Sequence, residues 1–302
     1  MPLSPGLPLP ANLTISRLSL GGATFGREID AAAAHALIDH AVARGMTHID
    51  TAAAYSAGES ERIVGAWLAS HESLRTSVTV ATKVLPPYSP AALDSAVAAS
   101  ADRIGVQVID LLYLHKWDPQ VETTETLGAL DRLVHCGRVR HIGASNFSGE
   151  QLRATLARQS ALGLTRFQFI QNNNNLAVRD VDDALRALCR ENGVGIVTYS
   201  PLGAGFLTGK HREGVQPGSR FDVIPGHQAI YFQPTAARRL ENLAKLADQT
   251  GQTMSHLALV WALHQPGITS VLIGGRSLSH IDQAFDALKV DEPSLLSALN
   301  AC

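Results

Sequence analysis

The sequence predicts a (β/α)8 barrel of eight parallel strands, with a long loop after the seventh strand, in a single domain over residues 1–302. Short apolar or β-branched runs recur along the chain, and each is followed by an Ala/Leu/Glu-rich stretch with helical spacing. There are eight such alternations in roughly 280 residues, which is the span expected of this barrel. The third observation is composition, since 302 residues with 45% hydrophobic and 17% charged residues can bury a large core.

Helical patterns lie between the expected strands. Two of these patterns, AAAAHALIDHAVARG and DVDDALRALCRENG, should end at Gly45 and Gly193, because glycine accepts the left-handed conformation at a helix C-terminus. The long loop should run from about Leu207 to Gln233, and a loop of this length is usually functional or mobile. The strand candidates are LSLGG from Leu18, THIDTA from Thr47, VTVATKV from Val78, DLLYLH from Asp110, HIGASN from His141, FQFIQN from Phe167, GIVTYS from Gly195 and SVLIGG from Ser270.

An open doubly wound sheet is the competing architecture, and it would place a glycine-rich phosphate loop directly after the first strand. The segment GGATFG, from Gly21 to Gly26, lacks the G-x-G-x-x-G spacing. In the segment AGFLTGKH, Gly209 and Lys210 match a phosphate loop, but His211 stands where a Ser or Thr is needed and no helical pattern follows. The first observation favours the closed barrel, and the second argues against a nucleotide-triphosphate site.

Composition also limits the classes of molecule that this protein is expected to bind. The net charge of -2 and pI near 6.6 provide no field that would recruit nucleic acid or an anionic membrane, so a small-molecule ligand is expected. Three unpaired cysteines indicate a reducing, cytoplasmic setting. The N-terminal MPLSPGLPLPANL has no basic residue before Arg17, so we interpret it as a lead-in or plug rather than a secretory signal. No apolar run reaches membrane-spanning length. The oligomeric state stays open.

Four titratable residues fall at or just beyond predicted strand ends, where a barrel directs side chains into its catalytic face. They are Asp50, Tyr55, Lys83 and His115. Each alone also has a structural interpretation, as a helix cap, a loop aromatic or a rim histidine. Lys83 is harder to explain structurally, because a lysine in an apolar strand must be partnered or shift its pKa. Asp50 on the neighbouring strand is the expected partner.

These residue types together suggest acid–base chemistry. An ammonium held by a carboxylate near a phenol would favour the phenolate and lower the pKa of Tyr55 from its usual value near 10. Tyr55 would then act as general acid or base, a role that contributes on the order of a hundred- to ten-thousand-fold. His115, as a neutral imidazole, would polarise the substrate carbonyl.

The chain resembles the aldo-keto reductase superfamily from Leu18 to about Leu288, and its loops look more like the potassium-channel β-subunit and bacterial sugar and keto reductase branches. The matching features are HIDTAAAYSAGESERIVGAWL with Asp50 and Tyr55, VATKV with Lys83, LLYLHKWDP with His115, GRVRHIGASNFS with Ser145 and Asn146, TYSPLGAGFLTGK from Thr198, and VLIGGRS from Val271.

The resemblance implies a catalytic tetrad of Asp50, Tyr55, Lys83 and His115, and a nicotinamide dinucleotide cofactor. The hydroxyl and arginine at the implied adenosine-phosphate position suit a 2′-phosphate, so NADP(H) is preferred, with NAD(H) as the alternative. The implied cofactor residues are Ser145, Asn146 and Gln171 at the carboxamide, Tyr199 stacked on the ring, Ser200, Leu202, Gly203 and Gly205 along the pyrophosphate, and Gly274, Arg276, Ser277, His280 and Gln283 at the adenosine end.

The chain departs from the family in two places. After the sixth strand it has QNNNNL, so Asn174 replaces a usual tyrosine, and the four asparagines are equally compatible with a plain polar loop. On the last barrel helix, His280 and Gln283-Ala284 replace the family's common residues, which puts the adenine contacts in doubt. No metal site is expected, because His35 and His40 lie five apart on a helix and do not share the face that zinc sites favour.

The predicted function is reversible NADPH-dependent reduction of an aldehyde or ketone. One alternative is a nicotinamide-binding regulatory subunit with little turnover, and another is a barrel isomerase or lyase that uses Lys83 as a Schiff base. Aromatic residues expected near the barrel mouth suit an apolar or cyclic substrate, although they are also compatible with loop packing. These candidates are Phe25, Trp117, Phe147, Tyr231 and Phe232.

Overall fold

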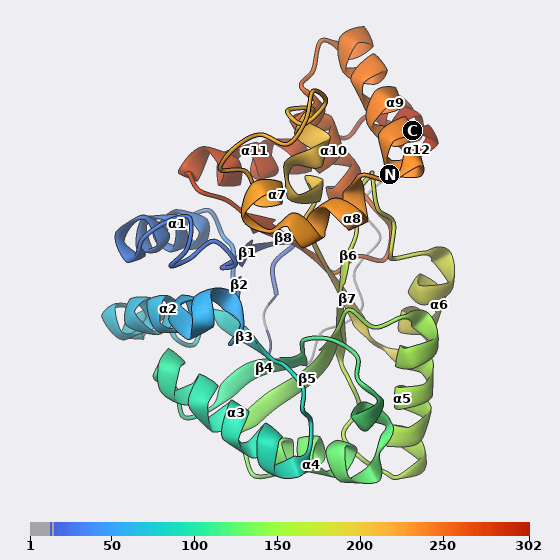
Figure 1. The fold of residues 1–302 in the computed structure, drawn as a ribbon. Helices are drawn as coiled ribbons and strands as arrows, with labels where there is room; N and C mark the ends of the chain where they lie inside the picture. The colour runs from blue at the N-terminus through green and yellow to red at the C-terminus, as the bar shows by residue number, and fades with distance from the viewer. Residues whose placement is uncertain (1–12, 14) are drawn as a thin grey trace.

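The computed structural model describes residues 13 and 15–302, and its eight parallel strands close into one barrel in the order β1 to β8 (Figure 1). Closure is direct, since Leu18 of β1 pairs with Val271 of β8. The predicted (β/α)8 fold with its eight strands is therefore confirmed. The strands are β1 (Leu18–Gly21), β2 (His48–Asp50), β3 (Thr79–Val84), β4 (Ile109–Leu114), β5 (Val139–Ser145), β6 (Phe169–Asn173), β7 (Gly195–Tyr199) and β8 (Ser270–Gly274).

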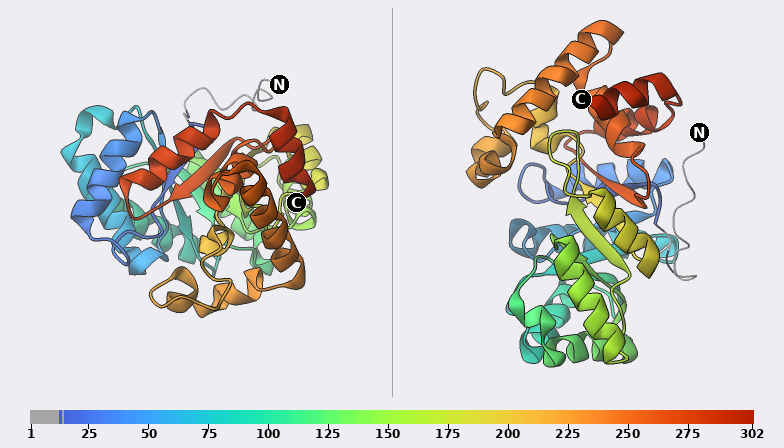
Figure 2. Two further views of the ribbon diagram at one scale, coloured as in Figure 1. Left: turned by 90° about the horizontal axis from the view of Figure 1, so that it is seen from above. Right: turned by 90° about the vertical axis from the view of Figure 1, so that its right-hand side faces the viewer.

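Helices surround the barrel and alternate with the strands as far as β7 (Figures 1 and 2). Several begin at the side-chain caps that the sequence supplies, such as Asp30 before α1 and the Ser148 capping box before α5. The helices are α1 (Ala31–Ala43), α2 (Glu59–Ser70), α3 (Pro90–Ile104), α4 (Thr124–His135), α5 (Gly149–Ala161), α6 (Asp183–Asn192), α7 (Arg220–Val223), α8 (Gln228–Tyr231), α9 (Pro234–Thr250), α10 (Met254–Leu263), α11 (Leu278–Leu288) and α12 (Pro293–Ala301).

The long segment after β7 contains more structure than the sequence suggested. The 3-10 turns η4 (Gly203–Thr208) and η5 (Pro225–His227) and the short helices α7 and α8 interrupt it. Their lengths of three to six residues are too short for a hydrophobic period to mark them in the sequence. This segment projects from the barrel beyond the end of β7 (Figure 2).

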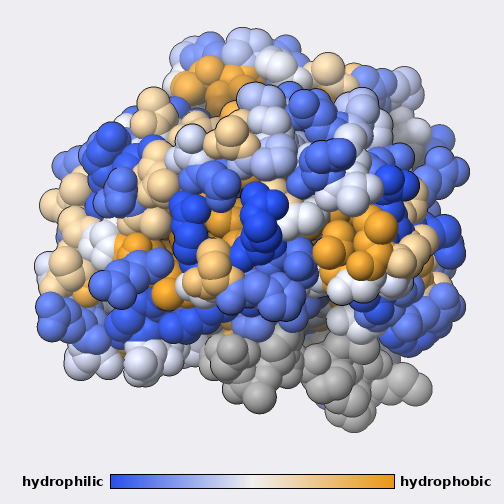
Figure 3. Space-filling view, turned by 90° about the horizontal axis from the view of Figure 1, so that it is seen from below, coloured by the Kyte–Doolittle hydropathy of each residue, from blue (hydrophilic) through white to orange (hydrophobic). Residues whose placement is uncertain are grey.

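The core has two layers because alternate strand residues face inward and outward. Inside the barrel, side chains such as Leu111, Phe169 and Leu272 pack with Leu13 and Ile15. A larger apolar layer lies between the strands and the helices. One outer face is mostly hydrophilic, with hydrophobic residues in separate small patches (Figure 3).

Two sequence predictions are not decided by this architecture. The proposed N-terminal plug falls mainly on residues 1–12 and 14, which lie outside the described residues, although Leu13 and Ile15 do pack inside the barrel. The single-domain assignment of residues 1–302 stays a prediction. Among the described helices, none combines the length and the apolar character that crossing a membrane requires.

Candidate active site

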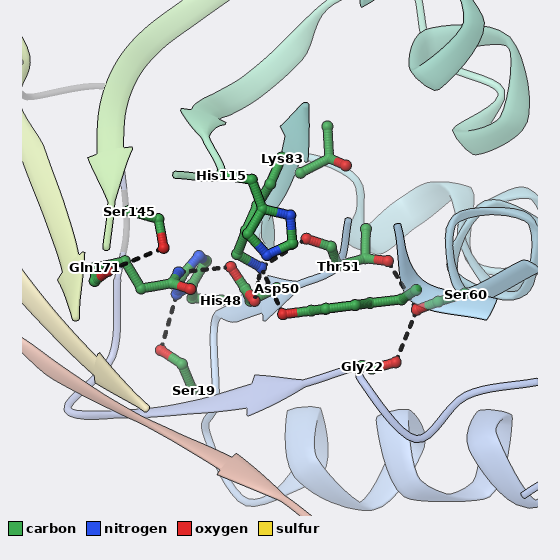
Figure 4. Close-up of polar contacts among 12 residues, drawn as sticks. Ser19, Gly22, His48, Asp50, Thr51, Ser60, Lys83, His115, Ser145 and Gln171 are labelled. Atoms are coloured by element: carbon green, nitrogen blue, oxygen red, sulfur yellow. Dashed lines mark hydrogen bonds and ion pairs between the residues drawn. The ribbon is translucent and has the colours of Figure 1, made fainter. Parts of the chain in front are cut away.

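The four titratable residues of the predicted tetrad meet at one end of the barrel. Asp50 is the last residue of β2, Lys83 is the penultimate residue of β3, and His115 directly follows β4. Tyr55 begins the 3-10 turn η1 (Tyr55–Gly58) after β2. The sequence predicts them on neighbouring strand ends, and the structure brings them together, since Lys83 contacts Asp50 and Tyr55 and His115 faces Tyr55. Figure 4 shows Asp50, Lys83 and His115 grouped at this end.

Lys83 is the centre of this group. Its Nζ forms a buried ion pair with Asp50 Oδ2, and both side chains are 1% exposed. Nζ also donates to the Thr51 carbonyl at 2.8 Å and to the Tyr55 hydroxyl at 3.1 Å. An ammonium has three donors, so all three are used and Lys83 is held in one position.

Burial disfavours the Lys83 ammonium, but Asp50 and Tyr55 outweigh burial, so the pKa of Lys83 lies above its ordinary value. The pKa of Tyr55 is also raised, because burial of the phenol has a larger effect than the nearby Lys83 ammonium. The expectation that Lys83 would lower the pKa of Tyr55 is therefore wrong in net sign. Lys83 acts in the expected direction, but Asp50 opposes it and burial dominates.

His115 faces Tyr55 across the mouth, with ring centroids 5.8 Å apart and planes at 83°. Burial, aided by the Lys83 ammonium, lowers the pKa of His115 to about 4. The imidazole is therefore neutral near pH 7, as expected from the sequence.

Backbone strain gathers at this end of the barrel. In the described chain, five residues other than glycine have a positive φ: Ser56, Ala57, Asn146, Ser200 and Ala204. All five lie in the turns that follow β2, β5 and β7, beside candidate catalytic or cofactor residues. Such conformations cost free energy and cluster at functional sites, so their presence in these turns indicates a functional site at this end of the barrel.

The three carboxamide candidates and Tyr199 form one hydrogen-bonded group at the ends of β5, β6 and β7. Ser145 Oγ donates to the Gln171 carbonyl at 2.9 Å, and Asn146 Nδ2 donates to Ser145 Oγ at 3.1 Å. The Tyr199 hydroxyl donates to Asn146 Oδ1 at 2.6 Å. The Gln171 side chain reaches Asp50 Oδ1 at 2.8 Å, a contact that no motif in the sequence predicts.

The turn that follows β7 forms a glycine-lined cradle. Ser200 and Leu202 lead into η4, where Gly203 and Gly205 have φ of 59° and 95°. The φ of 95° at Gly205 favours glycine, and a Cβ there would lie 3.3 Å from Lys210 Nζ, so the Lys210 side chain passes close to this turn. In the sequence Lys210 belongs only to a failed phosphate-loop match, yet its ammonium lies at this turn.

A cluster of basic groups lies where β8 leads into α11. Gly274 ends β8, and His280 Nδ1 accepts from the backbone N–H of Arg276 at 3.2 Å. Burial lowers the pKa of Lys210 and that of His280, and the Arg276 cation lowers both further. Ser277 is the N-cap residue of α11, and Gln283 is exposed on that helix.

These cations suit an anionic ligand. No ion pair found among residues 13 and 15–302 involves Lys210 or Arg276, so two cations lie close together without a carboxylate. Mutual repulsion between like charges is relieved by a bound anion. With the glycine cradle beside them, the residues present fit a phosphate-bearing dinucleotide.

The five aromatic substrate candidates do not share one environment. Phe25, Phe147 and Tyr231 are buried in the core, so their side chains pack the loops. Phe147 contacts Phe167 edge-on, and the Tyr231 hydroxyl donates to Asn173 Oδ1 at 3.2 Å. Trp117 is half-buried, and Phe232 is 42% exposed. Only these last two keep an accessible aromatic surface.

The four asparagines after Gln171 are buried and are not a plain polar loop. Asn172 Oδ1 accepts from the Asn146 N–H at 3.0 Å, and its Nδ2 donates to the Phe147 carbonyl at 2.8 Å. Asn175 Nδ2 donates to the Ser200 carbonyl at 3.0 Å. These amides fix the two strained residues Asn146 and Ser200, a role that the run of asparagines did not reveal in the sequence.

Within the described residues, no group of three or more His, Cys, Asp or Glu side chains could hold a metal ion. The two histidines of α1 have separate partners. His35 Nε2 lies 3.0 Å from the Ile63 carbonyl, and His40 Nε2 lies 2.8 Å from Asp282 Oδ1.

Comparison with known proteins identifies the family. The model of the aldo/keto reductase family matches residues 17–294. The chain belongs to this family. Aldo-keto reductases are oxidoreductases that generally use nicotinamide cofactors.

Individual proteins that are similar to this chain support the same family. The aldo-keto reductase dtxS3 of Metarhizium robertsii is 30% identical over 96% of this chain and 89% of its own. Norsolorinic acid reductase B of Dothistroma septosporum is 30% identical over 93% of this chain and 76% of its own. A probable voltage-gated potassium channel subunit beta of Arabidopsis thaliana is 26% identical over 93% of this chain and 89% of its own. Similarity to this channel subunit and to the uncharacterized oxidoreductase YrpG of Bacillus subtilis, 30% identical over 94% of this chain and 89% of its own, confirms the suspected branches of the family.

Proposed function

We propose that this protein is an NADP(H)-dependent oxidoreductase that reversibly reduces an aldehyde or ketone to an alcohol. The observation that carries the proposal is Lys83, whose buried ammonium contacts both Asp50 and the Tyr55 hydroxyl. A fixed cation beside a phenol stabilises the phenolate that forms when the phenol gives up its proton.

Tyr55 is the proton donor in the proposed reduction. Because burial raises its pKa, the phenol is protonated near pH 7 and can transfer its proton to the carbonyl oxygen. The neutral His115 imidazole donates a hydrogen bond to the same oxygen and orients the carbonyl. Lys83 then stabilises the phenolate, and Asp50 keeps Lys83 in place. A bound nicotinamide supplies the hydride to the carbonyl carbon.

The cofactor would lie across the ends of β5 to β8. Ser145, Asn146 and Gln171 would hold the carboxamide, with Tyr199 against the ring. Backbone groups from Ser200 to Gly205 would hold the pyrophosphate, together with Lys210, which the sequence alone did not assign to the cofactor. Gly274, Arg276, Ser277, His280 and Gln283 would hold the adenosine end. The preference for NADP(H) over NAD(H) rests on Arg276 and Ser277 at the adenosine end, because both cofactors carry the pyrophosphate that Lys210 would hold.

The proposed substrate is a small carbonyl compound with an apolar or cyclic part. Trp117, two residues beyond His115, and Phe232 of the long segment supply accessible aromatic surface. The three cysteines are free thiols, which supports a reducing, cytoplasmic setting.

The test is a screen of NADPH oxidation across sugars, cyclic ketones and aromatic aldehydes, with Tyr55→Phe as the blank. For each reduced carbonyl, the variant should lose at least about a hundredfold in rate, because a general acid contributes that much. Its NADPH affinity, followed by fluorescence, should stay nearly unchanged. A variant that keeps more than about a tenth of the wild-type rate contradicts the role of Tyr55.

The second candidate function is a nicotinamide-binding regulatory subunit with little turnover. The relative named as a potassium channel subunit beta favours it, since that protein matches over 93% of this chain. Slow reduction of every carbonyl tested, combined with tight NADPH binding and a stable protein complex, would support this candidate over the enzyme.

A Schiff-base mechanism at Lys83 is disfavoured. It needs a neutral amine with a free approach, whereas the pKa of Lys83 is raised and all three of its donors are engaged. Borohydride should therefore trap no substrate on Lys83.

A further inference from the structure

Gln171 touches the catalytic carboxylate from the far side of the barrel. Its Nε2 donates to Asp50 Oδ1 at 2.8 Å, and both residues are 1% exposed. The other oxygen, Asp50 Oδ2, accepts from Lys83. The two carboxylate oxygens thus have one buried donor each, from β6 and from β3. Figure 4 shows the Gln171 side chain pointing toward Asp50.

The backbone that carries Gln171 is itself fixed. The Gln171 carbonyl accepts from Ser145 Oγ at 2.9 Å and from the Asn146 N–H at 3.0 Å. Ser145 and Asn146 are the other two carboxamide candidates. The same three residues therefore connect the proposed nicotinamide position with the tetrad. Gln171 reaches the Asp50 carboxylate, and Asn146 Nδ2 donates to the His115 carbonyl at 2.9 Å.

No other side chain replaces this donor in the structure. Among the described residues, only Lys83 and Gln171 donate side-chain hydrogen bonds to the Asp50 carboxylate. His48 lies two residues earlier on β2, but its Nδ1 pairs with Ser19 Oγ at 2.9 Å. Without Gln171, Asp50 Oδ1 would be a buried acceptor with no partner, which is unfavourable for a charged oxygen.

We propose that Gln171 is a positioning residue for Asp50 and, through Lys83, for the Tyr55 hydroxyl, in addition to its contact with the carboxamide. This inference rests on the proposed function, since it concerns how Tyr55 exchanges its proton. Removal of the Gln171 donor leaves more of the Asp50 negative charge uncompensated at Tyr55. The phenolate then becomes harder to form, so alcohol oxidation, which starts from the phenolate, should suffer more than carbonyl reduction.

The test compares Gln171→Met with Ser145→Ala. Each variant removes one proposed carboxamide contact, but only Gln171→Met removes a donor from Asp50, and methionine keeps the side-chain volume. Single-turnover alcohol oxidation is measured at saturating NADP+ between pH 7 and 9. We expect about a tenfold lower rate in Gln171→Met, which corresponds to about one pKa unit at Tyr55. Ser145→Ala should lose less rate than Gln171→Met at saturating NADP+, because the donor to Asp50 remains.

A second readout needs no cofactor. In protein labelled with carbon-13 at the tyrosine ζ position, the Tyr55 signal is assigned by its loss in Tyr55→Phe. Its alkaline titration should move to higher pH in Gln171→Met and stay unchanged in Ser145→Ala. If both variants titrate as the wild type does and lose equal rates at saturating NADP+, Gln171 only binds the carboxamide and the inference is wrong.

Gln171→Glu keeps the inference testable if Gln171→Met does not fold. Two carboxyl groups in contact share one proton, so this variant should add a new ionisation to the pH profile of oxidation. A profile that matches the wild type would overturn the inference. Failure of the proposed function gives a different result, because Tyr55→Phe would then retain its rate whatever Gln171 does.

Discussion

At the ends of β2 and β3, Asp50 and Lys83 are both buried and form an ion pair, and each hydrogen-bonding atom of the pair has a partner. Where β8 leads into α11, Arg276 is exposed and lies near Lys210, and neither pairs with a carboxylate among the described residues. The Asp50–Lys83 pair neutralises its own charges. The positive charge of Lys210 and Arg276 would instead be neutralised by a bound anion.

This difference separates two tasks in one barrel mouth. A proton donor needs surroundings that stay fixed while charge moves, and a buried, fully paired cation provides them. A site that binds and releases a charged ligand needs accessible groups whose repulsion the ligand relieves. Substitutions in each region can therefore be expected to fail in different ways.

The largest effect should follow from breaking the buried pair. Lys83→Met leaves the Asp50 carboxylate buried without its cation, which should lower the free energy of unfolding by about 3–5 kcal/mol. Carbonyl reduction should be lost as well. Urea unfolding followed by circular dichroism measures the first effect. Lys289→Met is the matched control, because it breaks an exposed pair with Asp286 and should leave stability nearly unchanged.

The double variant Lys83→Met, Asp50→Leu separates stability from catalysis. Removing both charges leaves no unpaired buried charge, so most of the stability should recover while activity stays lost. If the double variant were as unstable as Lys83→Met, the loss would come from packing, and the pair would not be the cause.

A smaller effect should appear on acidification, again in the buried region. Burial lowers the pKa of His48 to about 4, against an ordinary value near 6.5. At a pH between these two pKa values, His48 is protonated in the unfolded chain and neutral in the folded chain. The His48 contribution to stability is therefore complete above about pH 6.5 and is lost as the pH falls toward 4, with about 2 kcal/mol lost by pH 5.

His48→Asn should reduce this loss of stability between pH 7 and pH 5, whereas His135→Asn should not, because His135 is an exposed residue of α4. The measurement is urea unfolding at both pH values. An acid-induced loss that is the same in His48→Asn and the wild type would mean that His48 titrates normally in the folded protein.

The sequence predicted the strand-end residues well because a barrel brings the C-terminal ends of its strands together whatever the loops do. Once the strands were assigned, their ends alone located Asp50, Lys83 and His115 at this end of the barrel. The sign of the pKa shift at Tyr55 could not be predicted, because it depends on how deeply the phenol is buried relative to Lys83. The order of residues in the sequence does not indicate how deeply the Tyr55 phenol is buried.

Contacts that cross the barrel were also beyond prediction. Gln171 and Asp50 are 121 residues apart, and no spacing rule connects β6 with β2. Phe25 and Phe147 follow strands as Trp117 does, and Tyr231 lies in the long segment after β7. All three are buried, because packing of the loops decides which way an aromatic side chain points. Lys210 carries no signal of its own in the sequence, because the phosphate loop that its glycines resemble needs a following helix.

The smallest predicted effect concerns the open region and asks whether its positive charge selects the cofactor. Arg276→Ala should weaken NADPH binding by about tenfold and NADH binding much less, because an arginine–phosphate contact contributes about 1.4 kcal/mol or more. Fluorescence titration gives both dissociation constants. Arg153→Ala is the control, since Arg153 is an exposed arginine of α5. Added salt should reduce the NADPH preference of the wild type and leave that of Arg276→Ala nearly unchanged, because the contact is exposed. Equal weakening of NADPH and NADH would remove the basis for the NADP(H) preference and leave the tetrad unaffected.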